Sequence, residues 1–267
     1  MTIDTAGPLL LLVMGLIVGS FLNVCIYRLP RDESVVWPSS RCTSCGRSLS
    51  WYENIPVLSW IALRGRCRTC RATISVQYPL VEAVTAALFV GGYFAIGPTP
   101  LLAARLLFAS AMVVLFAVDL EHLILPNEIT LPGTVVGFAI SFVLAPGWQS
   151  SLIGLAVGGL FPFLVAEAYA RLRGREGMGM GDFKMLAMVG AFLGWPMVWL
   201  VLILSCVLGI VIGGGALIVS KRGLATRIPF GTFIAVAAMI CAYGEEPVLR
   251  AYGQIVRAYL IWAGLAS

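Results

Sequence analysis

Long apolar segments separated by short polar turns run along the chain from residue 8 to residue 243. Each segment carries at most one charged residue, and several approach the roughly 20 apolar residues that an α-helix needs to cross a bilayer. The pattern predicts about eight membrane-spanning helices, at residues 8–27, 79–97, 101–118, 131–146, 149–170, 183–194, 196–219 and 229–243. Residues 246–264 form an amphipathic tail, which we expect to lie on the membrane or to dock against the other helices.

The composition agrees with a polytopic membrane protein and excludes an ordinary soluble domain. Of the 267 residues, 60% are hydrophobic and only 12% are charged, and the mean hydropathy is +0.94. The first apolar stretch begins at Pro8 without a preceding basic residue and continues to Tyr27, which indicates a retained helix rather than a cleaved signal peptide. We therefore expect an all-α membrane protein with a polar loop, residues 28–78, between its first two helices.

Basic residues are concentrated on one side of the predicted membrane topology. With the N-terminus outside, the connections that face the cytoplasm are 28–78, 119–130, 171–184 and 220–228. They hold 15 of the 18 Lys and Arg residues, whereas the outer turns "IGPTP", "APGWQSS" and "GWP" hold none. Because cytoplasmic loops are rich in Lys and Arg, the loop is predicted to lie in the cytoplasm, close to anionic lipid headgroups.

Two C-x2-C pairs stand in this loop, separated by 21 residues, and their members are Cys42, Cys45, Cys67 and Cys70. Each pair can hold a metal ion from a tight turn, and together the pairs complete a tetrahedral set of thiolates. Disulfides are disfavoured in a reducing cytoplasm, and no βαβ pattern suggests a redox pair. We predict a structural zinc, because four thiolates leave no open position and a loop of about fifty residues can hardly build a core of its own.

Two aspartates stand at predicted helix ends on the same face of the membrane. Asp119 ends the third helix, and Asp182 begins the sixth within "GMGDFKML". Asp182 could simply be a helix N-cap, whereas a carboxylate at the C-terminal end of a helix opposes the helix dipole. Two carboxyl groups brought together can share one proton, so that one activates water and the other polarises a carbonyl, as in aspartic peptidases. The helix dipoles alone predict that the proton rests on Asp119.

Neighbouring residues fit this chemistry. Gly179 and Gly181 would allow a tight turn and the close approach of a substrate strand. Lys184 stands two residues after Asp182, so on a helix it should face away from the carboxyl group and extend to the lipid headgroups.

Motifs spread in order over most of the chain resemble those of the type IV prepilin peptidases, also called leader peptidase/N-methyltransferases. The matching stretches are "GSFLNVCIYRLP" (19–30), "RCTSCGRSLSWYENIPVLSW" (41–60), "LRGRCRTC" (63–70), "VDLEHLILPNEIT" (118–130), "GMGDFK" (179–184) and "PFGTFIAVAA" (229–238). The combination is specific, although the G-x-G-D motif alone is shared with other intramembrane aspartic peptidases.

The resemblance implies cleavage of the leader peptides of type IV prepilins or type II secretion pseudopilins, at the cytoplasmic face and after a glycine. Bacterial members then methylate the new N-terminus with S-adenosylmethionine. Carried over, Asp119 and Asp182 are the catalytic pair, supported by Gly179, Gly181 and Lys184, and the four cysteines hold the zinc. No residue that binds the methyl donor can be identified.

Glu53 lies in the region that the resemblance connects with methylation, but a simpler interpretation is an ion-pair partner within the loop. Leaders of this class carry Lys or Arg before the cleaved glycine, so Glu121 and Glu128 are candidates to receive them.

The expected domains are 1–97, with two helices and the zinc loop in a methyltransferase-associated region, 98–243, a six-helix aspartic peptidase domain, and the tail 244–267. We expect a multi-pass protein of the bacterial inner membrane whose partners are leader peptides and lipids rather than nucleic acid. Three alternatives remain: a peptidase without methyltransferase activity, a proton-coupled transporter with the aspartates as a relay, and an assembly scaffold.

Overall fold

A computed structural model describes residues 5–174, 178–215 and 229–244, and in these parts the chain is almost entirely helical. The longer helices are α1 (Ala6–Arg28), α3 (Gln77–Ile96), α4 (Pro100–His122), α5 (Asn127–Ile140), α6 (Trp148–Leu155), α7 (Phe161–Arg173), α8 (Met180–Leu193), α9 (Trp195–Leu208) and α11 (Phe230–Tyr243). The short ones are η1 (Leu29–Arg31), η2 (Trp51–Asn54), α2 (Leu58–Ala62), and the π-helical turns η3 (Ala156–Leu160) and η4 (Gly209–Gly214).

The expected all-α membrane fold is confirmed. Within the described residues, five helical segments are long and apolar enough to cross a membrane, and α11 is a shorter apolar helix. Each of the eight expected segments contains a helix, with α6, η3 and α7 continuous through one of them. Residues 216–219 of the seventh segment and the expected tail helix at 246–264 lie outside the described residues.

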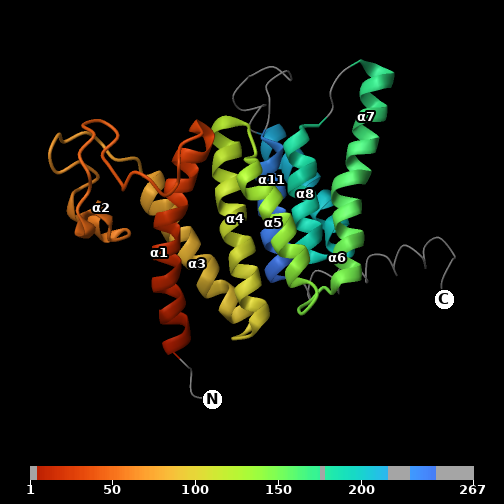
Figure 1. The fold of residues 1–267 in the computed structure, drawn as a ribbon, viewed down its shortest axis with the longest axis horizontal. Coiled ribbons are helices and arrows are strands. Elements are labelled where there is room, and N and C mark those ends of the chain that lie inside the picture. Colours follow the sequence, from red (N-terminus) through yellow and green to blue (C-terminus); the bar gives the residue numbers. More distant parts are fainter. Residues whose placement is uncertain (1–4, 175–177, 216–228, 245–267) are drawn as a thin grey trace.

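The helices α4, α8, α9 and α11 surround the main hydrophobic core. Their largest fully buried apolar side chains include Phe108, Leu115, Met185, Leu186 and Ile234. Figure 1 shows α1 and α3 on one side of this core and α6 with α7 on the other, while the loop that contains α2 projects beyond α1. Large apolar side chains on the outer faces of the helices are exposed, as a surface in contact with lipid requires.

Two helix pairs approach so closely that only glycine fits between them. A Cβ atom added to Gly15 of α1 would lie 2.5 Å from the Cα atom of Ala86 in α3. Gly154 of α6 and Gly190 of α8 meet backbone to backbone, so a side chain on either residue would force these helices apart. The second crossing fixes the position of α8, which carries Asp182.

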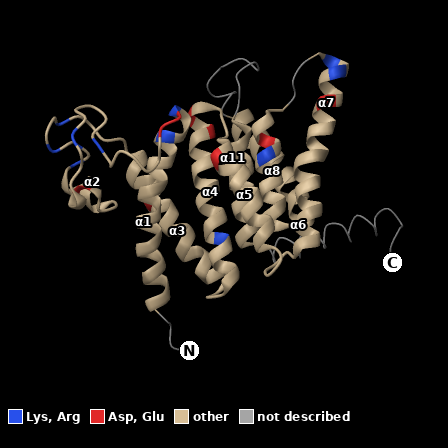
Figure 2. Cartoon of the chain, viewed as in Figure 1, with Lys and Arg blue, Asp and Glu red and all other residues tan. Residues whose placement is uncertain are grey.

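Charged residues are segregated. Figure 2 shows most Lys, Arg, Asp and Glu residues of the described parts in the loop beside α1 and at the adjoining end of the helices. The helix bodies are almost uncharged, so this end is where polar chemistry can take place.

Candidate active site and metal centre

The four loop cysteines come together. Their sulfur atoms all lie within 4.8 Å of one another, and the Sγ atoms of Cys42 and Cys70 are 3.8 Å apart. A tetrahedral zinc site with Zn–S bonds of about 2.3 Å separates its sulfur atoms by about 3.8 Å. The arrangement therefore fits a metal ion with four thiolate ligands.

Two similar turns present these thiols. In each turn the residue four positions after the first cysteine donates its N–H to that cysteine's carbonyl, from Gly46 to Cys42 at 2.9 Å and from Arg71 to Cys67 at 3.0 Å. Both donor residues have a left-handed backbone conformation, with φ of 70° at Gly46 and 61° at Arg71. The turns also direct backbone N–H groups at sulfur, and those of Cys70 and Thr69 lower the pKa of Cys67 to about 6. A stabilised thiolate is the form that binds metal.

Asp119 lies in the last turn of α4, where its side chain is buried and meets the start of α11. The Thr232 N–H donates to Asp119 Oδ2 at 2.9 Å. A Cβ atom on Gly231 would lie only 2.9 Å from the same oxygen, so this contact depends on a glycine. The unpaired N–H groups of a helix start favour an anion. The N-terminal end of α11 thus opposes the C-terminal end of α4, and the dipole argument for a proton on Asp119 loses its basis.

Asp182 is the third residue of α8 and is half-buried. The N-cap of α8 is Gly179, so the interpretation of Asp182 as a simple N-cap is wrong. The Asp182 carboxyl group instead reaches back toward the Gly179 N–H, as acids at this helix position do. A Cβ atom on Gly179 would lie 3.3 Å from Asp182 Oδ2, which is a tight contact.

Leu125, in the connection between α4 and α5, links the surroundings of the two aspartates. Its side chain would touch a Cβ atom on Gly181 at 2.9 Å and one on Gly231 at 3.1 Å. Gly181 precedes Asp182, and Gly231 adjoins the carboxyl group of Asp119. The two carboxyl groups are close enough to interact electrostatically.

Lys184 occupies a different position from the one expected. Its ammonium group donates to Asn127 Oδ1 at 2.8 Å and so joins α8 to the first residue of α5, instead of extending freely to the headgroups. This bond ties together two of the helices that border the aspartate pair.

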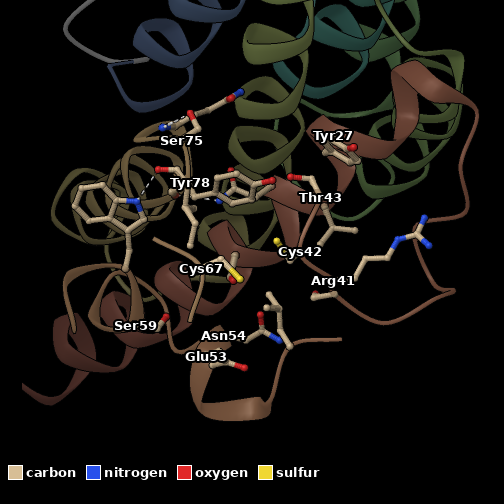
Figure 3. Close-up of a pocket in the computed structure, with 18 of the residues that line it drawn as sticks. Tyr27, Arg41, Cys42, Thr43, Glu53, Asn54, Ser59, Cys67, Ser75 and Tyr78 are labelled. Atoms are coloured by element: carbon tan, nitrogen blue, oxygen red, sulfur yellow. Dashed lines mark hydrogen bonds between the residues drawn. The ribbon is translucent and has the colours of Figure 1, made fainter. Parts of the chain in front are cut away.

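A second polar site lies between the cysteine loop and the ends of α1, α3 and α4. It is a cavity of about 590 Å³ whose lining includes Tyr27, Glu53, Trp60, Tyr78, Glu82 and Glu121. Figure 3 shows Tyr27 and Tyr78 toward one side and Glu53 toward the other, with Cys42 and Cys67 between them. Volumes of about 300–1,000 Å³ are usual for small-molecule sites.

Glu53 is an ion-pair partner within the loop. Its carboxylate accepts a hydrogen bond from Arg47 at 2.6 Å and another from the Ser50 N–H at 2.9 Å. The hydrogen bond from Arg47 lowers the pKa of Glu53. Both carboxylate oxygens are thus engaged in holding the loop.

The last turn of α4 separates the cavity from the aspartate pair. Residues two apart on a helix point to different sides. Asp119 faces α11, whereas Glu121 lines the cavity, where Gln77 of α3 lies 3.5 Å away.

The fold and the two sites define a helical membrane protein with a four-thiol loop and a pair of carboxyl groups at one end of its helices. Comparison with known families shows that the chain belongs to the type IV leader peptidase family: the model described by that name matches residues 106–214, and the model of the bacterial peptidase A24 N-terminal domain matches residues 13–96.

Relatives named prepilin leader peptidase/N-methyltransferase agree. The protein of Stutzerimonas stutzeri is 37% identical over 272 residues, which is 92% of this chain and 93% of that protein. The protein of Pseudomonas aeruginosa is 35% identical over 95% of this chain and 93% of its own length. The protein of Myxococcus xanthus is 46% identical over 78% of this chain, but the match spans only 63% of that longer protein. No solved structure matches the chain.

Three features were missed by the sequence analysis: the Thr232 contact to Asp119, the Asn127 partner of Lys184, and the cavity with Glu82. For Glu82 a signal was present, because it is the single charged residue of the apolar segment 79–97.

Proposed function

We propose that this chain is a membrane aspartic endopeptidase that removes the leader peptides of type IV prepilins or type II secretion pseudopilins and then methylates the new N-terminus. The observation that supports the proposal is the position of Asp119 and Asp182 at the ends of α4 and α8, close enough for their charges to interact, with Asp119 beside the start of α11. The names of the relatives support both activities.

In the proposed cleavage step the two carboxyl groups share one proton. The ionised group takes a proton from water, which attacks the carbonyl carbon of the leader's last glycine, while the protonated group polarises that carbonyl oxygen. The bond from this carbon to the next residue's nitrogen then breaks, and the departing nitrogen takes up the proton held by the pair. Thr232 holds Asp119 in place through its N–H, and Gly179 does the same for Asp182. The proton belongs to the pair, because two coupled acids titrate together.

The cytoplasmic face is the proposed location of this site. The concentration of charge at this end supports the assignment, as does the excess of Lys and Arg in the connections expected there. Glu121 and Glu128 are both exposed at this end and can receive the basic residues of a leader. A relay for proton transport would favour carboxyl groups near the middle of the membrane, whereas Asp119 and Asp182 stand at helix ends.

A structural zinc ion is proposed for Cys42, Cys45, Cys67 and Cys70. All four positions of a tetrahedral site are filled by thiolates, so its role is to hold the loop in shape. The loop supplies one wall of the cavity, and the ion would therefore maintain that wall.

The cavity is the proposed site for S-adenosylmethionine, and its residues fit such a ligand. Tyr27 and Tyr78 offer aromatic rings beside which adenine can lie, and the volume of about 590 Å³ is in the usual range for a ligand of this size. When bound, the donor supplies an electrophilic methyl group attached to a cationic sulfur.

Coexpression with a prepilin, followed by mass spectrometry of the pilin, tests the proposal. Asp119→Asn and Asp182→Asn should each abolish cleavage while expression and zinc content stay normal. Asp32→Asn is the matched control, because Asp32 is exposed and its left-handed backbone, with φ of 55°, suits asparagine equally well. Cleavage that survives in either of the first two variants would refute the aspartate mechanism, and a cleaved pilin without an added methyl group would refute the methylation.

A further inference from the structure

Glu82 is a buried carboxyl group that lines the cavity. It lies in the second turn of α3 with 7% of its surface exposed. Its Oε2 atom accepts the Val57 N–H at 2.7 Å, and Ser20 of α1 lies close by. Among the described residues, no Lys or Arg forms an ion pair with it. Carboxyl groups are rarely buried without a counter-charge unless they have a functional role.

Two of the arginines that line the cavity are already engaged with other groups. Arg28 donates to the carbonyls of Ser34 at 2.8 Å and Pro38 at 2.7 Å. Arg31 stacks on Tyr27, with its guanidinium carbon 4.0 Å from the ring centre.

Of the described acids that line the cavity, Glu82 is the buried one that is not held in an ion pair. On the loop side, Arg68 contacts Tyr52, Arg41 is exposed, and Cys42 and Cys67 belong to the metal site. Glu53 is held by Arg47, whereas Glu33 and Glu121 are exposed at the rim. The neutral polar side chains of the cavity lining include Ser20 and Asn23 of α1 and Tyr78 of α3.

The backbone opposite Glu82 is strained. Val57 has φ of 59° and ψ of −49°, an uncommon conformation for a β-branched residue, and it also lines the cavity. Such strain persists only where surrounding contacts enforce it, and it is frequent at functional sites. The hydrogen bond to Glu82 is a contact that holds Val57 there, so the loop wall and the carboxyl group are positioned together.

We propose that Glu82 accepts the proton of the new N-terminal ammonium group and so prepares that amine for methylation. The inference rests on the proposed function and assigns a residue to its second step. An α-ammonium group has an ordinary pKa of about 8, so at neutral pH most of it is protonated and has no electron pair with which to attack. A buried carboxylate without a counter-ion attracts this cation and takes its proton.

The step balances as follows in atoms and electrons. The ammonium proton passes to the Glu82 carboxylate, and the freed nitrogen forms a bond to the donor's methyl carbon. The carbon–sulfur bond breaks with its electron pair remaining on sulfur, which becomes a neutral thioether. The product is a protonated secondary amine, and Glu82 returns its proton to solvent through the open rim of the cavity.

The test uses the full-length protein in detergent and a synthetic pilin peptide that already has a free N-terminus, so cleavage is not required. Glu82→Gln keeps an oxygen that can accept the Val57 N–H but cannot take a proton. We expect methylation at pH 7 to fall by at least about 100-fold. Binding of labelled S-adenosylmethionine, measured by equilibrium dialysis, should stay within about twofold of the native value, and cleavage of full prepilin should be unchanged. Asp32→Asn removes an exposed acid that does not line the cavity and is the control; its methylation rate should stay near the native one.

The dependence on pH separates proton transfer from a merely structural role. Without an acceptor, only amine that is already neutral reacts, so the Glu82→Gln rate should rise about tenfold per pH unit up to about pH 8, whereas the native rate should rise less steeply. Equal slopes, or a loss of donor binding that matches the loss of rate, would overturn the proposal; the second result would make Glu82 a counter-charge for the donor.

Two further outcomes remain decisive. If Glu82→Gln also loses cleavage and zinc, it has not folded, and Glu82→Asp replaces it: a shallow pH dependence would support proton acceptance, and a steep one would contradict it. If the native protein cleaves prepilin but never methylates the peptide, the proposed methylation itself is wrong. A native protein that methylates, together with an equally active Glu82→Gln, refutes only the role of Glu82.

Discussion

Replacing Gly231 by alanine should disable cleavage by displacing Asp119. The new Cβ atom would lie 2.9 Å from Asp119 Oδ2 and 3.1 Å from its Cγ. The carboxyl group must retreat by about 0.5 Å to reach an ordinary contact, which stretches its 2.9 Å hydrogen bond from Thr232 to the limit of such a bond. Hydrogen bonds to charged groups contribute about 1.5–3 kcal/mol, and a misplacement of about 1 Å can reduce catalysis by about 100-fold. We therefore expect the turnover number to fall by about 10- to 100-fold.

The assay is cleavage of purified prepilin at saturating concentration, with thermal unfolding in detergent as the measure of folding. Gly91→Ala is the matched control, because Gly91 also lies in a helix and a Cβ atom there would meet nothing within 4 Å. It should cleave at the native rate. A native turnover number in Gly231→Ala would show that the close contact between α11 and Asp119 does not position the carboxyl group.

Three other changes test the loop and the helical core. Cys42→Ser combined with Cys45→Ser should abolish zinc binding and lower the folded yield, measured by metal analysis; a metal-free variant that folds normally and has lost only cleavage would contradict a structural role. Arg71 has a left-handed backbone, which costs a non-glycine residue about 1 kcal/mol, so Arg71→Gly should stabilise the turn and slow the transfer of zinc to a chelator. Gly46→Arg should introduce the same cost and speed the transfer. Unchanged rates in both variants would refute the strain. Arg105→Met should cost about 1–3 kcal/mol, because the guanidinium group is buried and donates to a carbonyl of α8 at 2.8 Å; an unchanged melting temperature would count against it.

The helices and the four-thiol cluster could be predicted because their causes are local. Apolar segments of sufficient length have few alternatives to a membrane helix, and two C-x2-C pairs in one loop have few alternatives to a metal site. The presence of Asp119 and Asp182 at helix ends followed from the same hydropathy pattern.

The surroundings of those residues could not be predicted, because they depend on segments far apart in the chain. Asp119 is held by Thr232, 113 positions away, and Lys184 by Asn127, 57 positions away. The pattern of hydrophobic residues predicts each helix separately. It does not predict which helix ends pack against one another. The dipole of α4 alone does not decide where the proton rests, since the start of α11 also faces Asp119 and acts in the opposite direction.

The last turn of α4, here called its tip, lies between the aspartate pair and the cavity and therefore affects how a reaction intermediate moves between them. In the proposed reaction a freshly cut chain end has to pass from the Asp119 side of this tip to the Glu121 side, around a helix about 10–12 Å in diameter. Transit then competes with escape into the bilayer. Larger side chains at the tip would slow this transit, so more cut chains would escape before they are methylated, even though each chemical step still proceeds on its own. The proportion of unmethylated product therefore measures how fast the cut chain end moves around the last turn of α4, relative to its escape into the bilayer.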